Sequence, residues 1–141
     1  MEKEQPNLAS LTLVPQSQMV KKGETFLVSV NINTGDYKVD TADVVLIFDP
    51  QILTVEKISE SLFFANYPIK KWEDGKVMIT GTIGPEESQT GGIKGEGPLA
   101  TVTFKALTDG VAQVNFDANS LVASQGQNVL GKTEETKYEI Y

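Results

Sequence analysis

The side chains that most often perform acid-base and nucleophilic chemistry are missing from this chain. Its 141 residues include no cysteine and no histidine. Ser-His-Asp and Cys-His catalysis, disulfide bonding and cysteine-based zinc sites are therefore excluded. The chemistry left open is a carboxylate pair, a serine-lysine arrangement, or calcium bound by oxygen ligands alone.

Oxygen ligands for calcium could come from two clusters. Asp36, Asp40 and Asp43 lie within one stretch, and Asp117 is followed by Asn119. Neither cluster has the ligand spacing of an EF-hand loop. Acidic residues next to turns usually cap the backbone or face solvent, so we expect no metal site and no other cofactor.

A glycosidase would need two carboxyl groups about 5–10 Å apart on either side of a cleft. Asp49 precedes Pro50 in a turn, while Glu86 and Glu87 lie in a glycine-rich segment, 84–98. No pair of carboxylates is held in place by neighbouring regular structure. We therefore expect a protein that is not an enzyme.

The composition is typical of one globular domain. Hydrophobic residues make up 40% of the chain and charged residues 22%, and the net charge is −7. An acidic chain is a poor ligand for nucleic acid or an anionic membrane surface, and no apolar run approaches the roughly 20 residues of a membrane span. Residues 1–6 lack the apolar core of a signal peptide. We expect residues 1–7 to be a flexible N-terminal tail or a cloning remnant and residues 8–141 to form the domain.

A strand over residues 42–48 organises the remaining pattern. Its even-numbered residues, from Ala42 to Phe48, are apolar and share one face because side chains alternate along a strand. The odd-numbered face carries Asp43, Val45 and Ile47. A strand that is apolar on nearly both faces belongs at the centre of a sheet, with the core below it and something covering it above. We predict that the even-numbered residues point into the core.

The same alternation indicates further strands. Turns rich in Gly, Pro and Asp separate them, and no stretch has a convincing helical period. Residues 84–98 are expected to form a loop and residues 118–132 a connection rich in Gly, Ser and Asn. About nine short strands predict an all-β fold, a two-sheet antiparallel β-sandwich. The other expected strands cover residues 11–14, 26–32, 53–55, 69–72, 76–83, 100–106, 111–117 and 136–141.

An aromatic segment, 59–74, contains the only tryptophan, Trp72. Together with Tyr67 it could form a platform for sugar rings, as in carbohydrate-binding modules. A lone tryptophan in a long connection is more often buried against the core. The whole segment could also fold over the odd-numbered face of the 42–48 strand.

Three motifs in this chain resemble those of cohesin modules. They occur in the order and with the spacing of that family, and the similarity extends over roughly residues 8–141. The resemblance implies a nine-stranded jelly roll, related in fold to some cellulose-binding modules, that binds dockerin modules in extracellular assemblies. The motifs are residues 20–28 (VKKGETFLV), 46–55 (LIFDPQILTV) and 97–106 (GPLATVTFKA).

The resemblance also implies a binding site. In cohesins of the first type one sheet face receives the dockerin, and its central strand carries an Asn-x-Asp pair. Aligned on residues 48–50, the Asp corresponds to Asp43, whereas Thr41 stands where the family has Asn. Family acidic residues follow the sixth strand, and Glu86 and Glu87 lie slightly downstream of that position. Calcium, by the same resemblance, belongs to the dockerin and not to this chain.

The alternating pattern and the resemblance indicate the same surface. With the even-numbered residues of the 42–48 strand pointing inward, the odd-numbered ones are exposed, together with alternate residues of the 76–83 strand. An exposed aliphatic side chain forgoes about 1.5–3 kcal/mol until a partner buries it. We expect the partner-binding residues to be Thr41, Asp43, Val45, Ile47, Met78, Thr80, Thr82, Glu86 and Glu87.

The sequence therefore predicts a non-catalytic interaction module, extracellular or at the cell surface, that binds a dockerin-like protein through one flat sheet face. It predicts no nucleic-acid partner and no insertion into a membrane. Two alternatives stay open at this point. One is a carbohydrate-binding module that recognises a polysaccharide, and the other is a structural spacer domain of a surface protein.

Overall fold

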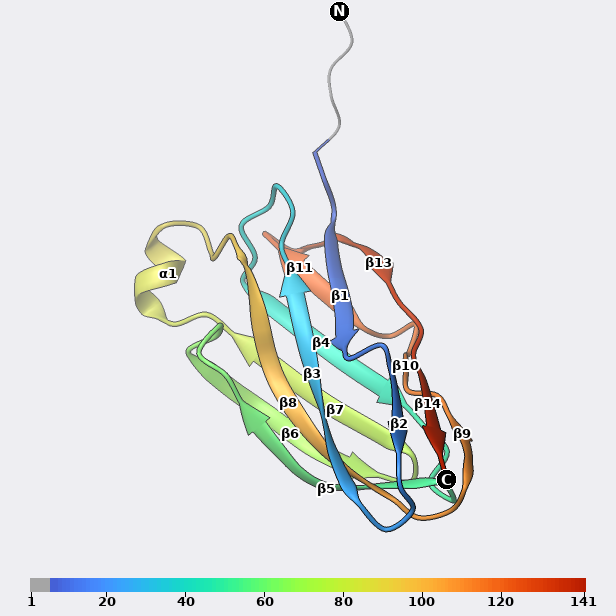
Figure 1. Cartoon of the computed structure of the whole chain (residues 1–141). Helices are drawn as coiled ribbons and strands as arrows, with labels where there is room; N and C mark the ends of the chain where they lie inside the picture. The colour runs from blue at the N-terminus through green and yellow to red at the C-terminus, as the bar shows by residue number, and fades with distance from the viewer. Residues whose placement is uncertain (1–5) are drawn as a thin grey trace, which may run out of the picture.

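Two β-sheets packed face to face form the body of the molecule (Figure 1). The structure is a computed structural model and describes residues 6–141. The five-stranded sheet has the strand order β13-β1-β3-β8-β5. Its strands are β1 (Ala9–Val14), β3 (Thr25–Asn33), β5 (Leu53–Glu60), β8 (Glu96–Ala106) and β13 (Leu130–Thr133).

The six-stranded sheet has the order β12-β11-β4-β7-β6, and β10 also pairs with β4. Its strands are β4 (Thr41–Ile47), β6 (Asn66–Glu73), β7 (Lys76–Thr82), β10 (Asn115–Phe116), β11 (Leu121–Ser124) and β12 (Gln127–Asn128). A smaller sheet, β2-β14-β9, lies at one side of the sandwich (Figure 1). It contains β2 (Ser17–Val20), β9 (Gly110–Ala112) and β14 (Lys137–Ile140). The all-β sandwich predicted from the sequence is confirmed.

The core lies between the two large sheets because alternate residues of the long strands are apolar. Val28 on β3 and Val102 on β8 have no exposed surface. Phe104 stacks on Phe26 with ring centroids 5.7 Å apart and meets Phe48 edge-on at 5.3 Å. Aromatic pairs of this kind contribute about 0.5–1.5 kcal/mol beyond the area that they bury. These contacts tie the segment after β4 to the opposite sheet.

The orientation predicted for β4 is confirmed. Val44 and Leu46 are 1% and 0% exposed, whereas Ile47 on the other face is 43% exposed. β4 pairs with β7 along one edge and with β10 and β11 along the other. Its backbone is therefore bonded on both sides, and its odd-numbered side chains face outward.

The aromatic segment does not cover this outward face, so the alternative in which it folds over β4 is wrong. Its C-terminal part is β6, which pairs with β7 and extends the sheet at its edge. Phe64 is buried and points inward. Its ring fills the space beside Gly81, where a Cβ atom would lie 2.5 Å from a ring carbon. A glycine at this position of β7 lets the aromatic connection pack into the core instead of over the sheet.

The C-terminal third contains more strands than the sequence predicted. The single strand expected over 111–117 is two, β9 and β10, and the connection 118–132 contains β11, β12 and part of β13. Between β9 and β10, the side chain of buried Thr136 makes the hydrogen bonds to Val114 that a neighbouring strand would otherwise make. The Val114 N–H donates to Thr136 Oγ1 (2.9 Å), which donates in turn to the Val114 carbonyl oxygen (2.8 Å). Because a hydroxyl group both donates and accepts, the strand can break here without leaving a buried backbone group unpaired.

The two ends of the domain lie at opposite poles because its first and last strands run parallel (Figure 1). β1 pairs in parallel with β13, and β2 with β14. Tyr138 on β14 is buried and donates a hydrogen bond to the Pro15 carbonyl oxygen (2.6 Å), between β1 and β2. At the start of the domain, the Asn7 N–H donates to Asp36 (2.7 Å). Residues 1–5 of the predicted tail lie outside the described residues.

We predict that stability falls at alkaline pH because of Tyr138. Burial raises the pKa of Tyr138 from 10.0 to about 12, and burial also raises the pKa of Tyr67. The unfolded chain therefore loses these protons at lower pH than the folded chain does. The stabilisation is complete below pH 10 and is lost between about pH 10 and 12, where roughly 1–3 kcal/mol disappears. Urea unfolding at a series of pH values measures this loss.

The matched variant for this experiment is Tyr138→Phe. It removes the hydrogen bond to Pro15 and is expected to cost about 1 kcal/mol at neutral pH. Its stability should then decline less steeply than that of the wild type above pH 10. An equal decline in both proteins would show that Tyr138 does not cause the effect.

Candidate functional site

The outward side of the six-stranded sheet brings most of the predicted site residues together. We call this surface, formed by outward residues of β11, β4, β7 and β6, the β4 face. Residues paired across antiparallel strands share a face, and Thr41 pairs with Thr82 at one end of it. Two neighbouring rows farther along are Lys71-Met78-Val45 and Ile69-Thr80-Asp43.

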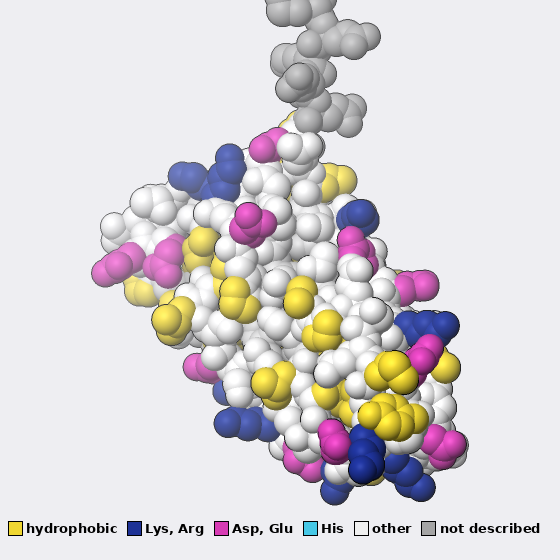
Figure 2. Space-filling model, in the orientation of Figure 1, with side chains coloured by type: hydrophobic (Ala, Val, Ile, Leu, Met, Phe, Trp, Pro, Cys, Tyr) yellow, Lys and Arg dark blue, Asp and Glu magenta, His cyan; other side chains and the backbone are white. Residues whose placement is uncertain are grey.

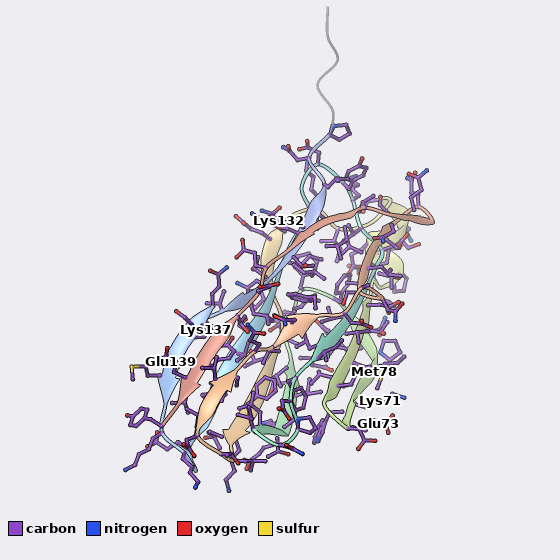
Figure 3. The ribbon with its side chains drawn as sticks, turned by 90° about the vertical axis from the view of Figure 1, so that its right-hand side faces the viewer. Lys71, Glu73, Met78, Lys132, Lys137 and Glu139 are labelled. Carbon is purple, nitrogen blue, oxygen red and sulfur yellow. The ribbon has the colours of Figure 1, made fainter. Side chains whose placement is uncertain are left out.

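A shallow depression of about 250 Å³ lies in the middle of the β4 face. Its floor is apolar, with Val45 and Met78 half-buried and Ile69 41% exposed. Figure 3 shows Met78 beside Lys71 at the outer edge of the sandwich. Polar groups around the floor come from Asp43, Thr80, Lys71 and Asn119.

The Asp43 carboxylate is held in place by its neighbour across the ladder. Thr80 Oγ1 donates a hydrogen bond to Asp43 Oδ1 (2.7 Å), and both side chains are half-buried. Within residues 6–141 the second carboxylate oxygen accepts no hydrogen bond from another side chain. This oxygen is therefore available to a donor from another molecule.

Ser120 fixes the part of the face that lies between β10 and β11, where the chain leaves the β4 ladder. The Val45 N–H donates to Ser120 Oγ (3.0 Å), and this hydroxyl donates to the Val45 carbonyl oxygen (3.0 Å). The Asp117 N–H donates to the same carbonyl oxygen (2.7 Å). A buried side chain thus substitutes for a strand at the centre of β4, and it places Asn119 at the edge of the depression.

Glu86 and Glu87 do not lie on the β4 face. They belong to a five-residue helix, α1 (Pro85–Gln89), inside the segment that was expected to be a loop. Proline at the first helical position and acidic residues in the first turn favour a helix here, and these signals were present in the sequence. α1 follows the end of β7, beyond Thr82. Among the described residues it is the only helix, and it is too short to cross a membrane.

Three residues of the depression were missed by the sequence analysis: Ile69, Lys71 and Asn119. The first two could have been found, because the turn at Asp74-Gly75 fixes the pairing of the strands on either side. With both turn residues at positive φ, a two-residue hairpin pairs Glu73 with Lys76 and brings residue 71 opposite residue 78. Asn119 had no such signal, since its place depends on the Ser120 hydrogen bonds.

The residues proposed for sugar stacking are not arranged as a platform. Tyr67 is half-buried, packs edge-on against Phe64 and donates its hydroxyl hydrogen bond to the Leu99 carbonyl oxygen (2.6 Å). Trp72 is 42% exposed on the edge strand β6, where it pairs with Val77 on the inward side of the sheet. Trp72 is therefore not buried against the core, which was one interpretation of a lone tryptophan. Among the described residues it also has no exposed tyrosine ring beside it with which to form a platform.

The carboxylates considered as calcium ligands accept hydrogen bonds from nearby backbone and side-chain groups, as Asp43 does from Thr80. Asp36 accepts the Asn7 N–H, Asp40 accepts the Gln125 N–H (3.2 Å), and Asp117 accepts the Asn119 amide (3.0 Å). Within the part of the chain that the structure describes, no group of three or more acidic side chains is placed to hold a metal ion. The hydrogen bonds of Asp36, Asp40 and Asp117 fix loops.

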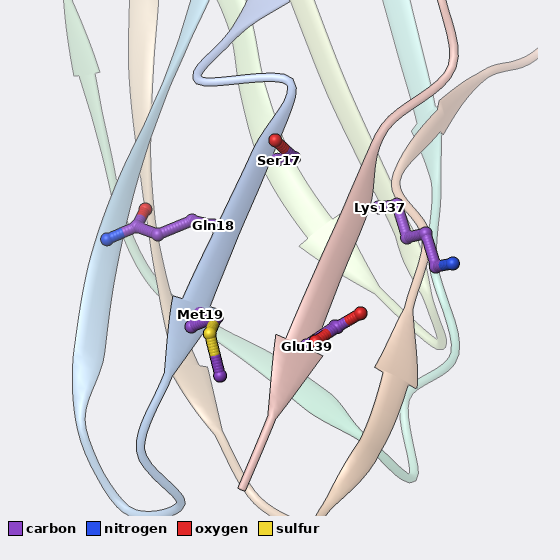
Figure 4. Close-up of a pocket in the computed structure, with 5 residues that line it drawn as sticks. All are labelled: Ser17, Gln18, Met19, Lys137 and Glu139. Atoms are coloured by element: carbon purple, nitrogen blue, oxygen red, sulfur yellow. The ribbon is translucent and has the colours of Figure 1, made fainter.

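A second hollow, also of about 250 Å³, lies on the small sheet between β2 and β14 (Figure 4). Among the residues that line it, Glu139 carries the single carboxylate and Lys137 the single ammonium group. A glycosidase needs two carboxyl groups across a cleft, and this hollow does not provide them.

The outward side of the five-stranded sheet differs from the β4 face in its distribution of charge. Its middle is mostly uncharged, and its charged side chains lie near the margin (Figure 2).

We predict that Ser120→Ala destabilises the domain and loosens β4 locally. The substitution leaves the Val45 N–H without its acceptor and should cost about 1–3 kcal/mol in the free energy of unfolding. Exchange of the Val45 amide proton with solvent should become faster. Urea unfolding and hydrogen exchange followed by NMR measure the two effects. Ser17→Ala, on the exposed side of β2, is the control and should change neither; unchanged exchange at Val45 in Ser120→Ala would contradict the role assigned to this hydroxyl.

Comparison with solved structures places this architecture among known folds. The complex of CaCohA2 with CaDoc0917 contains a chain that matches with a TM-score of 0.79 at 19% identity, covering 94% of this chain and 99% of that one. The sixth cohesin of scaffoldin B from Acetivibrio cellulolyticus, in complex with a mutant Cel5 dockerin, matches with a TM-score of 0.77 at 18% identity and covers 96% and 100%. A non-cellulosomal cohesin from the hyperthermophilic archaeon Archaeoglobus fulgidus gives 0.75 at 19%, with 95% and 91% covered. At these identities the likeness shows the fold, a cohesin-type sandwich.

Comparison at the level of sequence gives the family. A search of curated proteins finds no match. The family model described as "Cohesin domain" matches residues 11–140, which is almost the whole of the described chain. The match covers all three motifs on which the resemblance was based, and it agrees with the jelly-roll sandwich of the structure. The chain belongs to the cohesin family.

Proposed function

We propose that this chain is a non-catalytic interaction module that binds a dockerin through the β4 face. The observation that carries the proposal is the central strand β4, which is apolar on nearly both faces but covered on only one. Val45, Ile47, Met78 and Ile69 remain partly exposed side by side. A partner that covers them recovers hydrophobic free energy that the isolated domain lacks.

The extent of the face suits an interface of ordinary size. A standard interface buries about 800 Å² on each partner and involves roughly 20–30 residues a side. β4 and β7 alone offer too few outward residues, so β6, β11 and the segment around Asn119 contribute as well. An apolar centre with polar groups around it is the usual arrangement of such a surface.

The polar groups give the partner its expected chemistry. The free oxygen of Asp43 would accept a hydrogen bond, and the carboxylates of Glu86 and Glu87 on α1 would attract a basic partner at the edge of the face. Thr41 occupies the position where first-type cohesins have Asn, and threonine offers one hydroxyl group in place of an amide. The dockerin recognised here therefore differs in its contact opposite Thr41 from one that requires the amide.

The remaining features of the function follow from family membership. Cohesins are interaction modules without enzymatic activity, and we propose the same for this chain. We also propose an extracellular or cell-surface location, with any calcium bound by the dockerin. Neither a nucleic acid nor a lipid membrane is expected as a partner, because the chain is acidic, with a net charge of −7.

We predict that replacing Val45 and Met78 together by Asp abolishes dockerin binding. The two residues pair across β4 and β7, so the variant places two carboxylates at the centre of the apolar floor. Affinity for a calcium-loaded dockerin should fall by at least about 100-fold, as for the loss of a central hot spot. Both side chains are outward, so the melting temperature should change by no more than about 4 °C. Calorimetric titration and thermal unfolding measure the two quantities.

The matched control places the same charges on the opposite sheet. Leu27 and Thr103 pair across β3 and β8 on its outward side, and replacing both by Asp should leave dockerin affinity unchanged. Equal loss of affinity in both variants would contradict the assignment of the β4 face. If the protein instead binds no dockerin, and polysaccharide oligomers quench Trp72 fluorescence saturably, the proposed function is wrong and the carbohydrate-binding alternative is favoured.

A further inference from the structure

Two opposite charges, Asp43 and Lys71, line the depression of the β4 face and have no ionic partner within residues 6–141. The other charged pair of the face, Glu73 and Lys76, stands in a row with Ile47 outside the depression. Ion pairs in residues 6–141 join Lys70 to Glu60 (2.9 Å) and Lys132 to Glu134 (3.6 Å). Neither Asp43 nor Lys71 takes part in one. The contrast with Lys70 is informative, because this adjacent lysine of β6 points to the other side of the strand and is paired with the facing sheet.

The two free charges stand on either side of the apolar floor. Asp43 lies on β4 in the row Ile69-Thr80-Asp43, and Lys71 lies on β6 in the neighbouring row Lys71-Met78-Val45. β7 separates the two strands, so the backbones of the charged residues are roughly 10 Å apart across the sheet. Both side chains line the same depression, and Figure 3 shows Lys71 next to Met78.

The depression sets the size of what enters between these charges. A volume of about 250 Å³ accommodates one or two aliphatic side chains and not a helix. A side chain that enters contacts Val45, Met78 and Ile69 below it. Its neighbours on the partner then meet the ammonium group of Lys71 on one side and the carboxylate of Asp43 on the other.

We infer that the β4 face selects a dockerin that presents an aliphatic side chain flanked by a carboxylate opposite Lys71 and by a hydrogen-bond donor or cation opposite Asp43. This inference rests on the proposed function and names the partner chemistry that the same face requires. A partner with a basic residue opposite Lys71 brings like charges together as water is excluded, and such contacts are strongly unfavourable. Lys71 is then a specificity-determining residue.

The net charge of the domain makes this requirement distinctive. With a net charge of −7, the domain attracts basic partners in general. The carboxylate required to face Lys71 runs against this general preference for basic partners. Overall charge would therefore increase the rate of encounter with many basic dockerins, while Lys71 would retain those with an acidic group at one defined place.

The test is a charge reversal with a matched control, measured against a panel of calcium-loaded dockerins. Lys71→Glu reverses the charge on the β4 face. Lys57→Glu makes the same change at an exposed residue of β5, in the five-stranded sheet and away from the β4 face. Residue 57 pairs there with Thr103 of β8. For the dockerins that the wild type binds, Lys71→Glu should lower affinity by at least about 10-fold and Lys57→Glu by less than about twofold. Lys71→Glu should also gain affinity for dockerins with a basic residue at the facing position.

Each outcome of this experiment decides one question. If the wild type binds members of the panel and Lys71→Glu changes neither affinity nor rank order, the inference about Lys71 is overturned and the proposed function stands. If the wild type binds no dockerin at all, the proposed function fails and the inference fails with it. A reversed rank order in Lys71→Glu, with Lys57→Glu unchanged, supports both.

Discussion

The structure depends on a constraint imposed by β4, which must bury its even-numbered side chains while its backbone is bonded along both edges. Val44 and Leu46 point into the core, and the ladders to β7 and β11 keep the strand from rotating or slipping. Because a slip of one residue would exchange the two faces of a strand, the buried residues also determine which residues stay outside. Core packing on one side of β4 thereby fixes the composition of the surface on the other.

Hydroxyl groups make this arrangement possible where regular pairing stops. Ser120 bonds to both backbone groups of Val45, and Thr136 does the same for Val114. Each lets the chain depart from a ladder without leaving a buried N–H or C=O group unpaired. Thr80 plays a related part for a side chain by holding Asp43. The β4 face is consequently ordered before any partner arrives, which lowers the entropy lost on binding.

Much of the sandwich and part of the β4 face could be predicted from the sequence. Alternation gave the orientation of β4 and β7, since their inward residues are all apolar, and this placed Asp43, Val45, Met78 and Thr80 on one surface. The short strands β11, β12 and β13 could not be predicted, because their pairing is determined by distant partners and not by their own pattern. The position of Asn119 is a similar case. Glu86 and Glu87 were placed near the face by resemblance, whereas proline and acidic residues at 85–87 form a separate helical turn.

The parallel pairing of β1 with β13 and of β2 with β14 has a mechanical consequence. A tensile load applied at the two poles acts along these strands (Figure 1). It pulls them past each other lengthwise, so their hydrogen bonds resist in shear together and do not open one after another. The strands of the β4 face are not among those loaded in this way. A molecule bound to the face would therefore not itself carry the tension applied to the two ends of the domain.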